Sequence, residues 1–157
     1  MNEELQKSMR TYAWGYFVQH AEQRLKTFNF YVLFCTVIIG AFATLTSKNG
    51  SHTTYCVLPL LLPIFSFVFY KLDERTKMLI RNSEQALKYL DTLSLKDHPD
   101  AECVLSLIKI DENQTGDLPA YPLFNGGYFS YSRVFRWVFY LMSIIGILGV
   151  IYCFTEA

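Results

Sequence analysis

The chain has 157 residues, of which 52% are hydrophobic, 17% aromatic and only 18% charged. An average globular domain carries about 25% charged residues, so this sequence is poor in charge and rich in rings. Fourteen Lys and Arg residues balance fourteen Asp and Glu residues. This neutrality excludes a globally basic nucleic-acid-binding protein and an acidic disordered tail.

Residues 1–27 are predicted to form an amphipathic helix. They contain no proline, and their apolar residues recur at three- and four-residue steps, which is the helical period. No helix-breaking residue lies between Arg24 and Phe34. We therefore expect this helix to continue without interruption into the hydrophobic stretch that follows.

Three stretches of the chain are almost free of charged residues: Phe28–Ser47, Ser51–Tyr70 and Trp137–Thr155. Each has a length within the 17–25 residues that a helix needs to cross about 30 Å of hydrocarbon. The sequence therefore predicts an all-α membrane protein with three transmembrane helices, a hairpin at 28–70 and a last span at 133–157. The alternative is a soluble protein with three buried helices, which a chain of this length is too short to cover.

The second span contains Pro59 and Pro63. Neighbouring membrane helices can satisfy the carbonyls that a proline frees, so we expect a kink or a late helix start near Pro59. Residues 71–96 continue this span as a helix with one charged face, where Asp73–Lys77 and Glu84–Lys88 form opposite-sign i,i+4 neighbours. We interpret this face as solvated; a basic face that binds a ligand is the alternative.

Residues 97–132 are expected to form an insert and a loop. The apolar run Val104–Ile110 favours a short helix, and residues 111–127 are polar and punctuated by Pro and Gly, which is typical of a loop. Ser130 or Ser132 is a candidate N-cap for the last helix.

The basic residues lie almost entirely on one side of the predicted spans. Thirteen of the fourteen Lys and Arg residues fall in 1–27 or in the segment between the second and third spans, and Lys48 is the exception. The positive-inside rule then places the N-terminus in the cytoplasm and the C-terminus outside. Aromatic residues near the span ends fit an interfacial belt: Tyr31, Tyr55, Tyr70, Trp137, Tyr140 and Tyr152.

No catalytic or metal-binding pattern is present in the sequence. The His and Cys residues lack metal-ligand spacing, and there is neither a Gly-rich phosphate loop nor a nucleophile elbow. We therefore expect no enzyme activity, no metal and no cofactor. The spans also lack Asp, Glu, Lys and Arg, which argues against proton-coupled transport.

Small and polar residues recur at helical steps in two of the spans: Thr36, Gly40 and Thr44 in the first, and Ser143, Gly146 and Gly149 in the third. Such stripes let membrane helices pack closely. The alternative is that they line a narrow pore. Three spans are too few to enclose a pore, so this alternative requires a homo-oligomer, for which we expect a tetramer or a similar ring.

The cysteines leave two interpretations open. A single buried cysteine usually acts as a small hydrophobic residue. Cys56 and Cys153, however, both fall near the outer membrane face in the predicted topology, so a bond between them is possible if that side is oxidising.

The segment Trp14–Arg24, followed by Phe28–Tyr31 at the start of the first span, resembles the N-terminal pattern of small bacterial membrane effectors of anti-phage defence operons. These include the Hailong channel type and retron-associated types. The resemblance implies an oligomeric ion channel, held closed by a nucleic acid or nucleotide from a partner nucleotidyltransferase or reverse transcriptase.

Two sets of residues are candidates for the contacts that this resemblance implies. Lys109, Arg133 and Arg136 have the fewest acidic neighbours and are candidate phosphate ligands. His20 and Arg24 lie one turn apart and are a candidate polar pair between subunits. A non-conducting membrane adaptor that docks a cytoplasmic partner is the alternative function.

Overall fold

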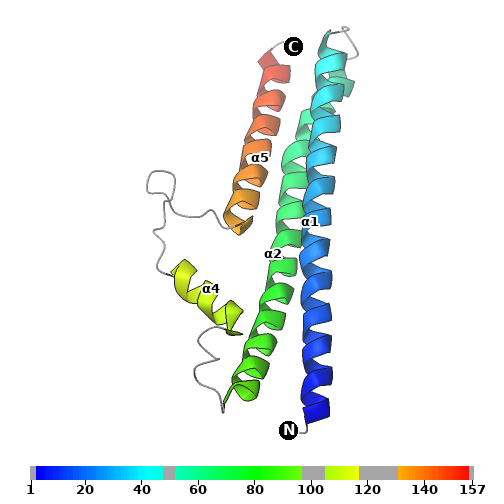
Figure 1. The fold of residues 1–157 in the computed structure, drawn as a ribbon. Coiled ribbons are helices and arrows are strands. Elements are labelled where there is room, and N and C mark those ends of the chain that lie inside the picture. Colours follow the sequence, from blue (N-terminus) through cyan, green and yellow to red (C-terminus); the bar gives the residue numbers. More distant parts are fainter. Residues whose placement is uncertain (1–2, 48–51, 97–104, 117–130, 156–157) are drawn as a thin grey trace. The chain divides into compact units, whose positions relative to one another are not determined.

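The computed structural model describes residues 3–47, 52–96, 105–116 and 131–155, with the side chains of 52–55 and 114–116 excepted. Every regular element in these ranges is an α-helix (Figure 1). The helices are α1 (Glu3–Ser47), α2 (His52–Ser94), α4 (Leu107–Gly116) and α5 (Tyr131–Thr155). The predicted all-α class is therefore confirmed, and α1, α2 and α5 are each long and apolar enough to cross a membrane.

The first two spans are parts of much longer helices, as predicted. α1 has 45 residues and α2 has 43, and neither is interrupted. Pro59 and Pro63 both lie inside α2, which already begins at His52. The expected late helix start near Pro59 is therefore wrong.

The chain divides into two compact units. One comprises residues 24–75 and 130–157 and contains the three uncharged stretches, so we call it the membrane unit. The other comprises residues 1–23 and 76–129, and we call it the polar unit.

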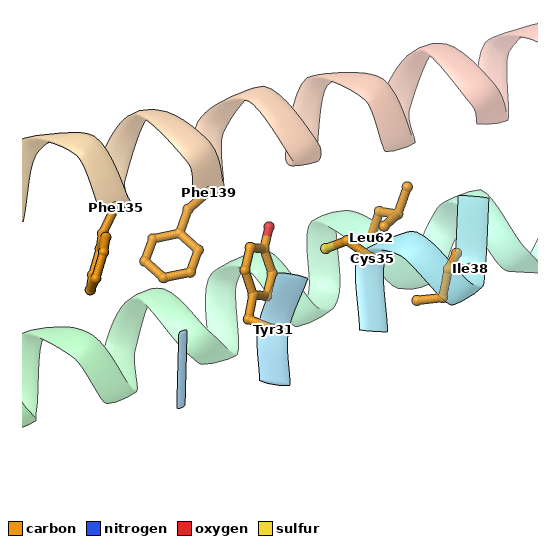
Figure 2. Close-up of a cluster of buried hydrophobic side chains, with 6 residues drawn as sticks. All are labelled: Tyr31, Cys35, Ile38, Leu62, Phe135 and Phe139. Carbon is orange, nitrogen blue, oxygen red and sulfur yellow. The ribbon is translucent and has the colours of Figure 1, made fainter. Parts of the chain in front are cut away.

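The core of the membrane unit takes side chains from all three long helices. Figure 2 shows this cluster, which consists of Tyr31, Cys35, Ile38, Leu62, Phe135 and Phe139. Phe28 of α1 stacks on Phe135 of α5 with ring centroids 3.8 Å apart. The buried positions of α5 are Ser132, Phe135, Phe139, Gly146 and Cys153, whose spacings of three, four and seven residues are those of a helix seam that packs knobs into holes.

The polar unit has a smaller core of Ala13, Leu87 and Leu90, with Phe17 and Ile108 packed against it. Its helix α4 continues to Gly116, so the predicted loop over 111–127 is wrong for its first six residues. The physical reason is a tertiary ion pair between Lys88 and Glu112, together with the apolar contact of Ile108. The remainder of that predicted loop lies outside the described residues.

Candidate functional site

A polar cluster ties the three long helices together within the membrane unit. The Arg24 Nε donates a hydrogen bond to Asp73 Oδ1 at 2.6 Å, and Nη2 donates to Asp73 Oδ2 at 3.0 Å. The same Nη2 donates to Ser132 Oγ at 3.0 Å. The side chains of Arg24 and Asp73 are 13% and 9% exposed. We call this largely buried set of Arg24, Asp73 and Ser132 the polar clamp.

The polar clamp forms because the hairpin brings together the residues that flank its two spans. Arg24 precedes the first uncharged stretch by one turn, and Asp73 follows the second by about one turn. The guanidinium also lies over the ring of Phe135, 5.2 Å from its centroid, which adds a cation–π contact. Bidentate pairing fixes the orientation of both side chains as well as their separation.

The structure corrects the interpretation of Asp73. Its expected place was on a solvated helix face beside Lys77, but Asp73 is buried and its carboxylate faces Arg24. Ser132 is likewise not an N-cap, because α5 begins at Tyr131 and the Ser132 hydroxyl accepts from Arg24. Ser130 lies outside the described residues.

The predicted pair of His20 and Arg24 has separate partners in this chain. His20 Nδ1 lies 3.1 Å from Gln23 Oε1, and the His20 ring meets the Tyr16 ring edge-on at a centroid distance of 4.3 Å. Arg24 belongs to the polar clamp. Their role between subunits stays a prediction.

A second polar contact lies in the core of the membrane unit. The Tyr31 and Ser66 hydroxyl oxygens are 2.8 Å apart, and Ser66 Oγ donates to the Leu62 carbonyl at 2.7 Å. Because the single Ser66 hydroxyl proton serves Leu62, Tyr31 is the donor to Ser66. Tyr31 is fully buried, so its expected place in an interfacial belt is wrong. Sequence reasoning did not single out Ser66.

The stripe in the third span packs against α2. A Cβ atom on Gly146 would lie 2.6 Å from Pro63 Cδ and 2.7 Å from the Pro59 carbonyl oxygen. A Cβ atom on Gly149 would lie 2.7 Å from Pro59 Cβ. The two glycines therefore allow a backbone approach that any larger residue would prevent. Ser143 is half-buried beside them.

The stripe in the first span faces outward. Thr36, Gly40 and Thr44 are all exposed, and a Cβ atom on Gly40 would meet nothing within 4 Å. The Thr36 and Thr44 hydroxyls donate to the carbonyls of Val32 and Gly40 at 2.9 and 2.8 Å. Each hydroxyl oxygen keeps acceptor capacity toward whatever covers this face.

Two of the three predicted phosphate ligands lie together. Arg133 and Arg136 surround a hollow of about 270 Å³ with Trp137 and Tyr140. Lys109 lies on α4 in the polar unit, so joint action of the three basic residues stays a prediction.

The carboxylate of Glu74 lies in the same unit as these arginines. Hydrogen bonds from Lys71 and Tyr70, both 2.8 Å long, lower the pKa of Glu74, and the charge of Arg136 adds to this effect.

The polar unit contains an aromatic groove of about 500 Å³ between the parts of α1 and α2 that belong to it. Its walls carry the rings of Tyr12, Tyr16 and Tyr89, and polar groups come from Asn82 and Ser83. Tyr12 and Tyr89 are more than 60% exposed, whereas Ser83 is buried. The volume is that of a small-molecule site. Sequence reasoning missed this groove, although Tyr12 and Tyr16 share a helix face.

The described residues contain no cluster of His, Cys, Asp and Glu that would hold a metal ion. The three apolar helices, joined by largely buried polar contacts, define a helical membrane protein. The chain belongs to the octameric membrane protein family (8xMP), which matches residues 10–155. The expectation of a self-associating membrane protein is therefore confirmed, whereas the expected tetramer differs from the octamer by which the family is described.

A curated relative supports the same placement. The chain is 28% identical over 152 residues to CD-NTase-associated protein 19 of Escherichia coli. The matched region covers 94% of this chain and 91% of the relative. No solved structure matches the chain. The relative is named as associated with a CD-NTase, and the family is described as an octameric membrane protein, so the expectation of a non-enzymatic protein agrees with both.

Proposed function

We propose that this protein is a homo-oligomeric effector of anti-phage defence in the bacterial inner membrane. Its spans form a gated ion channel that depolarises the membrane. The N-terminus is cytoplasmic and the C-terminus lies outside, as the distribution of Lys and Arg favours. The membership of an octameric membrane family and the name of the E. coli relative support this proposal.

The outward stripe of α1 carries the channel proposal. In one chain, Gly146 and Gly149 are already used in packing against α2, whereas Thr36, Gly40 and Thr44 face away from the core. A ring of subunits can place this stripe along its axis, where the Thr hydroxyls offer oxygen atoms to permeating ions and hydrophobic neighbours act as the gate. Val37, which follows Thr36 and is 61% exposed, is such a hydrophobic neighbour.

The gating signal in this proposal is a nucleotide or nucleic acid made by a partner nucleotidyltransferase, or by a reverse transcriptase in a retron-type system. The aromatic groove offers tyrosine faces for a planar base and the Asn82 amide for its edge. Arg133 and Arg136, together with Lys109, are the candidate phosphate ligands.

The experiment is conductance of the purified oligomer in planar bilayers. Thr36→Val with Thr44→Val is expected to lower unitary conductance severalfold, because it replaces hydroxyls with methyl groups of the same shape. Thr46→Val is the matched control, since Thr46 makes the same bond to the carbonyl four residues earlier, at 2.8 Å, but is half-buried.

An oligomer that never conducts, with or without nucleotides, contradicts the channel. Recovery of a stoichiometric cytoplasmic partner together with an intact membrane potential in induced cells then identifies the non-conducting adaptor.

A further inference from the structure

We infer that Cys56 and Cys153 are the site of an intramolecular disulfide that fastens the outer end of α5 to that of α2. This inference rests on the outward topology proposed above and not on ion conduction. The structure has both residues as free cysteines, and their side chains are near enough to interact.

The glycine contacts of α5 explain why two cysteines on different helices come so close. Disulfides need Cα atoms about 4.4–6.8 Å apart, which two residues on different helices reach only where they face each other across a close helix contact. Pro59 lies against Gly149 and Gly146. Cys56 lies three residues before Pro59 and Cys153 four residues after Gly149, so both lie about one turn from this contact, on the facing sides of antiparallel helices.

Cys35, the third cysteine in the described spans, lies apart from this pair. Cys35 is 1% exposed within the aromatic core of the membrane unit and lies in the middle of the first uncharged stretch. It is therefore an internal reference that stays reduced.

The chemistry is thiol–disulfide exchange with a disulfide-carrying oxidoreductase on the outer side of the membrane. Cys56 is half-buried and Cys153 is buried, so the Cys56 thiolate attacks the disulfide of the oxidant first and forms a mixed disulfide, releasing one thiolate. The Cys153 thiolate then attacks Cys56 Sγ. Two protons and two electrons leave the chain, and the oxidant becomes a dithiol.

The test counts free thiols in the full-length protein. Cells are quenched with acid, and the denatured protein is labelled with a maleimide–polyethylene glycol that adds a fixed mass per thiol. The sequence has four cysteines, so the inference predicts two adducts without reduction and four after reduction. Cys153→Ser is expected to give three adducts under both conditions, which assigns the protected pair.

Four adducts without reduction overturn the inference, and treatment of isolated membranes with diamide then gives the reason. Two adducts after diamide mean that the thiols adjoin but face a reducing compartment, so the proposed topology is wrong. Four adducts after diamide mean that the contact itself is absent. Bilayer conductance is measured separately, so failure of the channel proposal is distinguished from failure of the disulfide.

Discussion

Arg24 and Asp73 stand 49 positions apart in the sequence, and they form a bidentate ion pair with distances of 2.6 and 3.0 Å. The pair is nearly buried, and Ser132 of α5 joins it. A buried pair contributes little net stability by itself, but its geometry fixes which residues of the three helices stand at the same level.

Removing either charge of this pair is expected to destabilise the protein strongly. Arg24→Met leaves the buried Asp73 carboxylate without its counter-ion, and Asp73→Leu leaves the Arg24 guanidinium without its counter-ion, each at a cost of about 3–5 kcal/mol. The double variant is expected to recover most of the loss, because no uncompensated charge remains. Denaturant unfolding in detergent micelles measures this.

The matched control is the exposed pair of Lys71 and Glu74, whose hydrogen bond is 2.8 Å long. Lys71→Met is expected to change unfolding little, because solvent screens an exposed pair. Single variants of the polar clamp that unfold like Lys71→Met would show that Arg24 and Asp73 are solvated in the folded protein.

The spans could be predicted from the sequence, but the polar clamp could not. Uncharged stretches are a property of neighbouring residues, so the three spans and their long continuations could be predicted by reading along the chain. The partner of Asp73 lies on another helix, and the i,i+4 pattern pointed instead to Lys77, which is near in sequence. The same reason hid the pair of Tyr31 and Ser66 and the extension of α4 through Glu112, since each depends on a tertiary contact.

The two stripes were indistinguishable in sequence for a related reason. Helical spacing shows that Thr36, Gly40 and Thr44 share a face, and that Gly146 and Gly149 nearly do, but it does not show what each face meets. That depends on the rotation of α1 and α5 about their own axes, which the core around Tyr31 and Phe139 determines.

Substitution by alanine is expected to destabilise the folded chain at Gly146 but not at Gly40. At Gly146 the new methyl group would lie 2.7 Å from a backbone oxygen, so α5 must shift, at a cost of about 1–3 kcal/mol. At Gly40 it meets nothing within 4 Å, so folding of the single chain is unaffected and any effect falls on the assembly. Unfolding in detergent and native mass spectrometry separate the two; equal unfolding of both variants would contradict the close contact of α5 with α2.

The hydroxyl of Tyr31 is expected to stabilise the core through Ser66. Tyr31→Phe and Ser66→Ala should each cost between about 0.6 and 1.7 kcal/mol, the average and the maximum for hydrogen bonds between membrane helices. The double variant should cost hardly more than either single variant, because each of the three variants removes the same hydrogen bond between the two hydroxyls. Tyr140→Phe is the control, since Tyr140 is 54% exposed. Strict additivity in unfolding experiments would show that the two hydroxyls are uncoupled.

Glu84 is expected to give the polar unit a pH-dependent stability of unusual sign. Partial burial raises the pKa of Glu84, the charges of Glu112 and Asp111 raise it further, and Lys88 and Arg81 oppose them. The folded state therefore binds the proton more tightly than the unfolded state. Its contribution to stability is full below the ordinary carboxyl pKa and is lost as pH rises through the raised one. Glu84→Gln should raise the Tm at pH 7 and flatten its decline between about pH 4 and 7.

Glu74 supplies the control of opposite sign, because the hydrogen bond from Lys71 lowers its pKa and its contribution is lost as pH falls. Glu74→Gln should therefore reduce Tm slightly at neutral pH and leave the slope that Glu84 causes in place. Thermal unfolding of the full-length protein across this pH range checks both variants. A Glu84→Gln profile parallel to that of the parent protein would show that the carboxyl is equally solvated in the folded and unfolded states.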